Sequence, residues 1–261
     1  MNHFLRPKKH LGQHFLHDEN IARKVAASLT GFGGYSHVLE VGPGTGALTK
    51  WLITNPAYHW AGVDVDDESV AFLKESLKDF HPRIIHADFL KLDLSKCFDG
   101  DRFAVIGNFP YNISTQILFK VLENRQLVPE LVGMFQREVG VRIVTEPGSK
   151  VYGILSVLTQ AFYDVELLFY VGEKVFIPAP KVKSVVIRMQ RKERIQLDCD
   201  ENVFFRVVKT AFNQRRKTLR NALKPVAINW DALPAAWGGK RAEQMCVADF
   251  VQMCQHAYTG I

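Results

Sequence analysis

The residues with the most specific chemistry lie in one octapeptide, Gly107-Asn-Phe-Pro-Tyr-Asn-Ile-Ser114. The amide oxygen of Asn108 and the backbone carbonyl fixed by Pro110, most simply that of Phe109, can accept hydrogen bonds from an exocyclic amino group. An amine such as adenine N6 is a poor nucleophile because its lone pair is delocalised into the ring. Holding both of its hydrogens lets the nitrogen become pyramidal. Tyr111 can stack on a flipped-out base. The motif therefore favours methyl transfer to an exocyclic amine, without a general base once the reactants are aligned.

A glycine-rich segment, Val38-Leu-Glu-Val-Gly-Pro-Gly-Thr-Gly-Ala-Leu-Thr49, predicts a site for a nucleoside-containing cofactor. Its glycines let the chain turn tightly and approach a ligand closely, and the following helix begins with free N–H donors. Asp64 is expected at the end of the second strand, where its carboxylate can accept both ribose hydroxyls. Because Gly42, Gly44 and Ala47 also satisfy the G-x-G-x-x-A pattern, this segment alone fits a nicotinamide cofactor as well as S-adenosylmethionine.

Asp88, in His86-Ala-Asp-Phe89, is expected to close the third strand. From there its carboxylate could face the same crevice and accept a hydrogen bond from an adenine amino group. An isolated Asp is equally typical of a helix N-cap or a turn. Only its register with Gly42 and Asp64 favours the cofactor role.

These residues need a parallel sheet to bring them together. Between His37 and Arg188, short β-rich runs alternate with helical patterns, which predicts βαβ units and a mostly parallel sheet with helices on both faces. In such a sheet the strand before Asn108 lies beside the first strand, and ligands bind at the carboxyl ends. The expected strands are His37–Val41, Trp60–Val65, Arg83–His86, Phe103–Gly107, Leu131–Phe135, Val165–Tyr170 and Ser184–Met189.

The residue pattern changes after Met189, where no further strand is expected. We predict a catalytic domain at 1–192, of which 1–30 form a basic segment and a helix, and a small all-helical domain at 193–261. On a helical wheel the apolar residues from Phe204 to Leu223 share one arc, and a basic face occupies another. Arg215 falls on the apolar side, so the helix is expected to bend or restart near Asn213–Gln214. The basic face contains Arg206, Lys209, Arg216, Lys217 and Arg220.

Composition narrows the function classes. The 261 residues include 33 Lys and Arg against 27 Asp and Glu, a net charge of +6, and basic blocks stand near both ends of the chain. This placement favours a nucleic-acid partner. No apolar run is long enough for a membrane span, and the N-terminus lacks a secretory signal. The four cysteines form no C-x-x-C pair and no metal ligand set is visible, which favours a reducing cytoplasm.

Taken together, the motifs resemble the KsgA/RsmA family, the rRNA adenine-N6,N6-dimethyltransferases of the small ribosomal subunit. The similar segments run through nearly the whole chain: Lys8–Leu16, Glu40–Gly44, Asn108–Thr115, Gln136–Val139, Phe176–Ser184, Ala211–Arg220 and Arg241–Glu243. The resemblance implies a Rossmann-like methyltransferase sheet that uses S-adenosylmethionine. It also implies dimethylation of two adjacent adenosines in the 3′-terminal hairpin of 16S rRNA within the 30S subunit, and a role late in subunit assembly.

The same resemblance implies roles for single residues. His14 and Leu16 would line the cofactor's entrance, Gly42 its methionine end, Asp64 its ribose and Asp88 its adenine.

Asn108 would bridge the cofactor and the target amine, and Phe176 would form a second aromatic wall around the target base. The chain departs from the family pattern at His14, where Asn is common, and at Phe109, where Leu is more usual.

Other functions are open on these residues. A macrolide-resistance methyltransferase shares the Asn-x-Pro-Tyr chemistry but acts on large-subunit rRNA, and the basic segment 212–220 resembles the small-subunit group instead. A non-catalytic assembly factor could keep the fold as a scaffold, although the intact motifs argue against lost catalysis. A nicotinamide dehydrogenase leaves Asn108 and Tyr111 unexplained. Nothing in the sequence requires more than a monomer.

Overall fold

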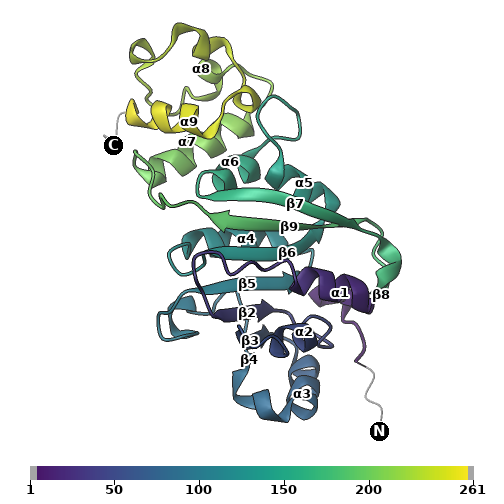
Figure 1. Cartoon of the computed structure of the whole chain (residues 1–261). Coiled ribbons are helices and arrows are strands. Elements are labelled where there is room, and N and C mark those ends of the chain that lie inside the picture. The colour runs from purple at the N-terminus through teal and green to yellow at the C-terminus, as the bar shows by residue number, and fades with distance from the viewer. Residues whose placement is uncertain (1–4, 258–261) are drawn as a thin grey trace. The chain divides into compact units, whose positions relative to one another are not determined.

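The computed structural model describes residues 5–257 and contains two compact units. The first unit comprises Met1–Gly140 and Glu166–Arg191, and the second comprises Val141–Val165 and Lys192–Ile261. A seven-stranded sheet has the order β4-β3-β2-β5-β6-β9-β7 (Figure 1). Its strands are β2 (His37–Val41), β3 (His59–Asp64), β4 (Ile84–His86), β5 (Phe103–Asn108), β6 (Glu130–Gln136), β7 (Tyr163–Val171) and β9 (Ser184–Arg191).

The sheet confirms the predicted α/β fold. Strands β4, β3, β2, β5 and β6 pair in parallel, and β9 pairs antiparallel with β6. β5 lies directly beside β2, as expected for the strand that leads into Asn108. Its residues Phe103 to Gly107 are all buried. An unbroken apolar run is typical of a central parallel strand, because helices cover both of its faces.

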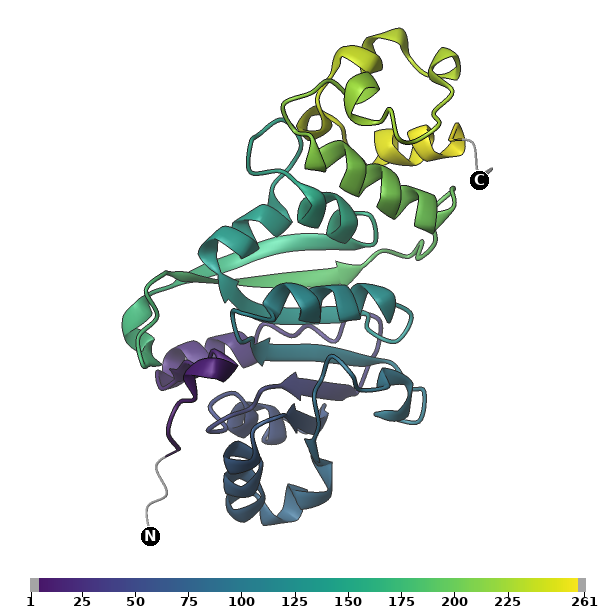
Figure 2. The same ribbon diagram turned by 180° about the vertical axis from the view of Figure 1, so that it is seen from behind.

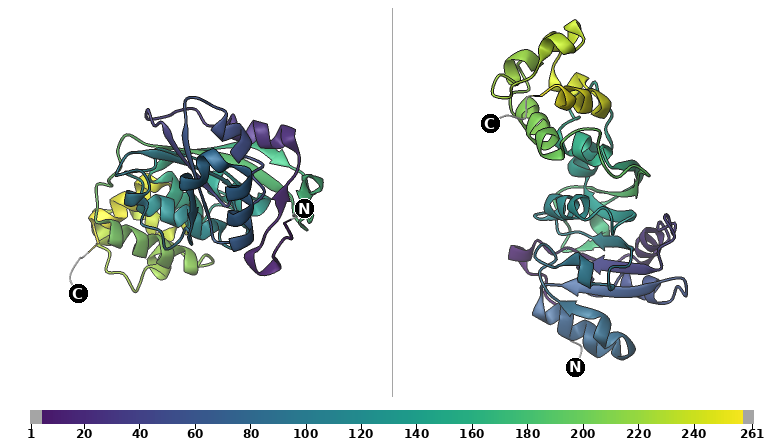
Figure 3. Two further views of the ribbon diagram at one scale, coloured as in Figure 1. Left: turned by 90° about the horizontal axis from the view of Figure 1, so that it is seen from below. Right: turned by 90° about the vertical axis from the view of Figure 1, so that its left-hand side faces the viewer.

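Helices pack on the two faces of this sheet. Figure 1 shows α1 (Glu19–Ala26) on the face turned toward the viewer, and Figure 2 shows α4 (Ser114–Glu123) on the other face. The right-hand view of Figure 3 shows the strands between these two helices. Residues of α2 (Thr49–Ile53) and α3 (Asp67–Ser76) share one hydrophobic core with α1. Asp18 begins α1 by accepting from the Ile21 N–H, 3.0 Å away.

A separate two-stranded sheet joins the N-terminal segment to the loop before β9. β1 (Phe15–Leu16) pairs antiparallel with β8 (Phe176–Ile177), with Leu16 opposite Phe176. Both of these facing residues are buried in the core beneath α1. Short 3-10 helices occupy Lys9–Leu11, Lys78–Arg83, Leu94–Lys96, Glu173–Val175, Trp230–Ala232, Ala235–Gly239 and Ala242–Gln244.

The second unit is helical apart from the start of β7. It contains the end of α5 (Arg137–Val144), α6 (Ile154–Gln160), α7 (Glu201–Asn213), α8 (Leu219–Ala222) and α9 (Val247–Gln255). α7 ends at Asn213, which confirms the predicted break. Arg215 explains that break, because its guanidinium donates to the backbone oxygens of Lys150 and Tyr152 at 2.8 and 3.0 Å.

The division into units differs from the predicted one in the segment Val141–Val165. The sequence pattern groups this segment with the catalytic domain, whereas its compact packing is with the second unit. Tyr152 packs edge-to-face on Phe212, with ring centroids 6.0 Å apart, and the Gly148 N–H donates to the Glu243 carbonyl at 2.7 Å. These contacts join residues far apart in the chain, so periodicity along the sequence could not predict them.

Candidate active site

The carboxyl ends of four neighbouring strands bring the predicted cofactor residues to one edge of the sheet. Val41 pairs with Val63, Asp64 with His86, and Glu40 with Ile106, so these strands end level with one another. In sequence the polar residues appear as Gly42, Asp64, Asp88 and Asn108. Because the strand order is β4-β3-β2-β5, their order along the edge becomes Asp88, Asp64, Gly42 and Asn108.

A cavity of about 240 Å³ lies at this edge. Seven predicted site residues line it: His14, Gly42, Asp64, Asp88, Asn108, Pro110 and Tyr111. Gly44, from the predicted glycine turn, lines it as well, and so do Gly12, Gln13, Phe15, Val65, Leu90 and Asn112, for which the sequence predicted no role at the site. Of these, Val65 follows the strand-end Asp64 directly and is 50% exposed, whereas the sequence pattern included it in the second strand.

Two backbone N–H groups hold the Asp64 carboxylate. Its Oδ2 accepts from Gly44 N–H at 3.2 Å, and its Oδ1 accepts from Asp66 N–H at 3.0 Å. The side chain is buried, and this burial raises the pKa of Asp64 above its ordinary value although the backbone hydrogen bonds lower it. No cation pairs with it among residues 5–257. Since a carboxylate has about four acceptor positions, Asp64 keeps acceptor capacity for a ligand in the cavity.

Gly44 must be a glycine for two reasons. Its φ of +52° lies in the left-handed region, and a Cβ there would stand 3.0 Å from the Phe15 ring. The bare backbone of the glycine turn therefore lets Phe15 close one side of the cavity.

Asp88 makes the turn contact that is typical of an isolated Asp and also lines the cavity. Its Oδ1 accepts from the Leu90 N–H at 3.0 Å, the turn contact expected of an isolated Asp. Its side chain is 36% exposed and its Oδ2 lies 3.5 Å from the Lys91 ammonium. The residue also lines the cavity, so the turn fixes the carboxylate without consuming all of its acceptor capacity.

The side chain of Asn108 is oriented by the N-terminal segment. Its Nδ2 donates to the backbone carbonyl of His14 at 2.8 Å. Because a carbonyl oxygen can only accept, the nitrogen end of the amide must face it. The Oδ1 end is thereby turned away from His14, and it accepts no hydrogen bond from another residue that the structure describes. Asn108 thus offers a positioned acceptor at the cavity.

Phe109 anchors the backbone of the same loop. Its ring is buried and packs edge-to-face on Phe135, with centroids 5.3 Å apart. A Cβ at Gly107 or Gly133 would come within 2.7 and 2.2 Å of this ring. The two strand glycines therefore make the space for the ring, and the ring fixes the position of the Phe109 carbonyl.

Tyr111 is held by two contacts. Its hydroxyl lies 2.5 Å from Ser184 Oγ, and its ring stacks on His14 with centroids 5.5 Å apart. His14 Nδ1 lies 2.7 Å from the Pro178 carbonyl, so this nitrogen must carry the proton. Burial raises the pKa of Tyr111, which keeps the phenol neutral at physiological pH. Since His14 covers one face of the ring, the other face is the one that could receive a base.

The structure does not bring Phe176 to this cavity, contrary to its predicted role as an aromatic wall. Phe176 is 2% exposed and packs into the core opposite Leu16. Side chains alternate along a strand, so its neighbour Ile177 points outward and is 56% exposed. Leu16 lines a void of about 20 Å³ beside Gly42 and Asn108, but it does not line the 240 Å³ cavity.

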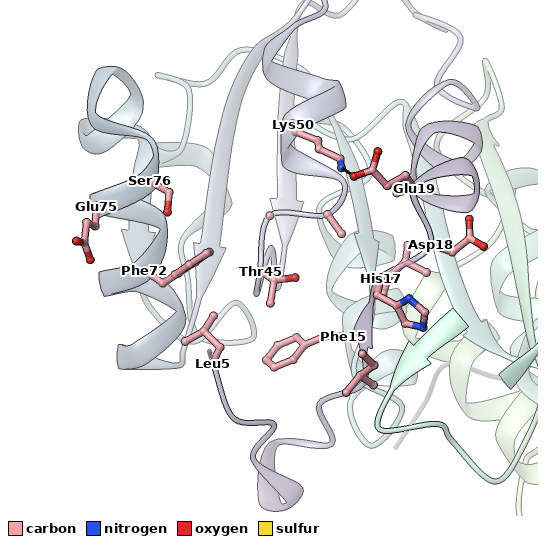
Figure 4. A pocket seen from close by; sticks show the side chains of 15 residues that line it. Leu5, Phe15, His17, Asp18, Glu19, Thr45, Lys50, Phe72, Glu75 and Ser76 are labelled. Atoms are coloured by element: carbon pink, nitrogen blue, oxygen red, sulfur yellow. Dashed lines mark hydrogen bonds and ion pairs between the residues drawn. The ribbon is translucent and has the colours of Figure 1, made fainter. Parts of the chain in front are cut away.

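A larger cavity of about 710 Å³ also has Phe15 in its lining (Figure 4). Three of its charged side chains are already engaged within the protein. The Lys50 ammonium is paired with Glu19 at 2.5 Å, and Asp18 is engaged as the N-cap of α1. Of the predicted site residues only Leu16 lines it. The smaller cavity is therefore the candidate active site.

The predicted basic face lies on the second unit and is solvent-exposed. Its five residues are on α7, on α8 and in the turn between them, and none forms an ion pair with a residue of the described part of the chain. The Arg220 guanidinium lies 5.4 Å from the centre of the Trp230 ring.

Within residues 5–257, no three His, Cys, Asp or Glu side chains gather as ligands of one metal ion would. In the same range no helix has the length and apolar character that a bilayer crossing requires.

Comparison with known proteins identifies the family of the chain. The family model described as ribosomal RNA adenine dimethylase matches residues 5–246. A protein of Cytophaga hutchinsonii named ribosomal RNA small subunit methyltransferase A is 53% identical over 249 residues, 95% of this chain and 96% of that protein. Its namesake in Flavobacterium johnsoniae is 51% identical, over 96% of this chain and 95% of the relative.

Solved structures share the fold. A dimethyladenosine transferase of Plasmodium falciparum superposes with a TM-score of 0.75 at 24% identity, covering 92% of this chain and 96% of that one. The 23S rRNA methyltransferase ErmE gives a TM-score of 0.70 at 22% identity, covering 92% and 99%. With the family model spanning most of the chain and relatives above 50% identity along it, this protein belongs to the ribosomal RNA adenine dimethylase family.

Proposed function

We propose that the protein transfers methyl groups from S-adenosylmethionine to N6 of two adjacent adenosines in the 3′-terminal hairpin of 16S rRNA. The product would be N6,N6-dimethyladenosine in the small ribosomal subunit. The observation that carries this proposal is the orientation of Asn108, whose amide oxygen is left as an acceptor at the cavity. The names of the relatives from Cytophaga and Flavobacterium support the small subunit as the source of the substrate.

The residues of the cavity fit the cofactor. Asp64 would accept the ribose hydroxyls with its remaining lone pairs, and Asp88 would accept the adenine amino group. Val65 and Leu90 line the same space and would pack against the flat ring. The glycine turn at Gly42 admits the methionine end. When bound, S-adenosylmethionine supplies an electrophilic methyl group on its sulfonium.

The protein's own contribution is to hold and reshape the amine. Asn108 Oδ1 and the Phe109 carbonyl accept the two N6 hydrogens, which draws the lone pair out of conjugation with the ring. Tyr111 stacks on the flipped base with the face that His14 leaves open. The methylated nitrogen is a strong acid, because loss of its proton restores conjugation, so water can take the proton. Tyr111, as a neutral phenol, contributes contact and position instead of proton transfer.

The basic face of the second unit (Arg206, Lys209, Arg216, Lys217 and Arg220) is proposed to bind rRNA phosphates. Its cations are exposed and free of ion pairs with described residues, as a polyanion-binding surface requires. We further propose a cytoplasmic location, because bacterial subunits are assembled in the cytoplasm. We also propose a monomer, because the described part of one chain supplies every residue proposed for the cavity. The role of Phe176 at the base is not part of the proposal, since its side chain lies in the core.

A second candidate is methylation of large-subunit rRNA, because ErmE has the same fold. Methyl-labelled cofactor offered with unmethylated small subunits, and separately with unmethylated 23S rRNA, distinguishes the two. We expect labelled N6,N6-dimethyladenosine only in the small subunits. Label in 23S rRNA would favour the second candidate. Tight small-subunit binding with no label in either RNA would contradict both and favour a non-catalytic assembly factor.

A further inference from the structure

Four cations of the first unit lie on segments that contact residues of the active site. We call them the basic rim and define it as Arg137, Lys174, Lys181 and Lys183. All four side chains are exposed, and none forms an ion pair with a residue between 5 and 257. The acids nearest to them in sequence are Glu138 and Glu173. No ion pair with a described residue therefore neutralises these four cations.

Exposed apolar side chains gather on the same segment. Six large apolar residues are exposed in the described chain, and three of them lie between positions 170 and 182: Tyr170 (57%), Ile177 (56%) and Val182 (43%). The Arg137 guanidinium lies 5.8 Å from the centre of the Tyr170 ring. An aromatic face beside unpaired cations is the combination that proteins use to bind single-stranded nucleic acid, with bases on the ring and phosphates on the cations.

Hydrogen bonds connect the basic rim to the site. Ser184, directly after Lys183, has its Oγ 2.5 Å from the Tyr111 hydroxyl. The Pro178 carbonyl lies 2.7 Å from His14 Nδ1. The Arg137 N–H donates to the Lys183 carbonyl at 2.9 Å, which joins the two segments of the rim. A strand that placed one base on Tyr111 would have its neighbouring phosphates at this surface.

We infer that the basic rim binds the rRNA strand flanking the target adenosine, with its cations on phosphates and Tyr170 under a base. This inference rests on the proposed function, because it takes the substrate to be RNA that enters at Tyr111. It gives the catalytic unit an RNA contact of its own. The basic face of the second unit would then supply overall affinity, and the rim would hold the strand at the site.

The test compares two triple variants. The first, Lys174→Ala/Lys181→Ala/Lys183→Ala, removes three cations of the rim. The matched control, Lys78→Ala/Arg83→Ala/Arg102→Ala, removes three exposed cations that precede β4 and β5, at the opposite edge of the same sheet. Binding of unmethylated small subunits is measured without cofactor over a range of salt, and methyl transfer is measured as KM and kcat.

For the rim variant we expect KM to rise at least tenfold while kcat at saturating subunits changes less than twofold. The slope of log affinity against log salt should fall by about 2, since each lost single-strand phosphate contact removes about 0.7. The control variant should match the wild type in KM and in the salt slope. Tyr170→Leu, which removes the ring and leaves the charges, should raise KM without changing the slope.

Several results would overturn the inference. Equal salt slopes for the rim variant and the control would mean that the rim is only solvated. A fall in kcat with unchanged KM would assign the segment to the positioning of Tyr111. Lost affinity for subunits with unchanged affinity for isolated 16S rRNA would assign it to a ribosomal protein. By contrast, wild-type protein that binds subunits but transfers no methyl group would contradict the proposed function, and the salt slopes would still decide about the rim.

Discussion

The two ends of the large sheet each hold a buried carboxylate, and they use it differently. At the amino end, Glu130 accepts from four donors: Thr30 N–H and Oγ1, the Tyr35 hydroxyl and Gln190 Nε2, at 2.5–3.0 Å. At the carboxyl end, Asp64 accepts from two backbone N–H groups and faces a cavity. A saturated carboxylate can only hold the fold together, whereas one with spare acceptor positions can bind a ligand. Acceptor capacity therefore separates the functional end from the structural end.

Asn108 extends this comparison to a neutral group. Its Nδ2 donates to the His14 carbonyl, and its Oδ1 remains available as an acceptor at the cavity. The same side chain is thus both anchored and available. This combination allows a small group to be oriented before the substrate arrives, which is how preorganised polar groups lower a barrier.

Asn108→Ala should produce the largest effect at the carboxyl end. Losing one positioned polar group in a transition state costs on the order of 10²–10³ in kcat, and we expect methyl transfer to fall by about that factor. Cofactor affinity, measured by calorimetry, should change much less. Asn112→Ala, at an exposed amide lining the same cavity, is the control. If cofactor affinity fell as far as the rate, Asn108 would be a cofactor ligand and not a holder of the amine.

Glu130→Ala should have the opposite signature at the amino end. It removes the acceptor of the buried Tyr35 hydroxyl and of the partly buried Thr30 N–H, whereas Gln190 Nε2 keeps Thr30 Oγ1 as an acceptor. We expect the loss to cost about 3 kcal/mol of the free energy of unfolding. Urea denaturation measures this cost. Cofactor affinity of the folded variant should be unchanged. Glu166→Ala, at an exposed acid paired with Arg188 at 2.6 Å, should cost less than about 1 kcal/mol. A large loss of cofactor affinity in Glu130→Ala would remove the distinction between the two ends.

The raised pKa of Glu40 should make the free energy of unfolding depend on pH. Burial raises its pKa to about 7, although Thr49 Oγ1 and Trp60 Nε1 donate to it at 2.7 and 2.8 Å. The native state therefore holds a proton that the unfolded chain releases near its ordinary pKa of 4.5. Stability from this group is complete below pH 4.5 and is lost as the pH rises to about 7.

Over that window the free energy of unfolding should fall by roughly 2–3 kcal/mol more in the wild type than in Glu40→Gln, at 1.36 kcal/mol per pKa unit. Chemical denaturation at a series of pH values measures the difference. Parallel pH profiles for the two proteins would show that the pKa of Glu40 is the same in the native and unfolded states, which would contradict the prediction.

Asp64→Ala is expected to give the smallest of these changes in function. Cofactor affinity is measured on the folded variant, because the Gly44 and Asp66 N–H groups also lose their acceptor. Losing a charged acceptor of the ribose hydroxyls should weaken the cofactor by about 10–100-fold, or roughly 1.5–3 kcal/mol. Asp67→Ala, at an exposed acid at the start of α3, serves as the control, because among residues 5–257 its carboxylate pairs only with His86, at 2.8 Å. Cofactor affinity unchanged in Asp64→Ala would place the ribose elsewhere and leave the spare acceptor positions without a role.

The sequence predicted the strand ends well because their signals are local. Glycines in a turn, an Asp directly after an apolar run and the Asn-Phe-Pro-Tyr loop can be read without knowing what lies nearby. The amphipathic pattern of α7 and its end at Asn213 were readable for the same reason. Phe176 shows the limit of such reading. A shift of one residue in the register of β8 would exchange its inward-facing and outward-facing side chains. The observed pairing with β1 places Phe176 in the core and Ile177 on the surface.

By itself, then, the sequence determined the family, the fold class and the residue types available for chemistry, because motif spacing and periodicity are properties of short segments. Tertiary structure alone decided which of those groups are saturated and which are left available. The partner of Asn108 lies 94 positions away, that of Tyr111 73 positions away, and the hydroxyl that meets Glu130 95 positions away. Hydrogen-bond capacity is used up by whatever the fold brings within about 3 Å, and no local pattern specifies which distant group that will be.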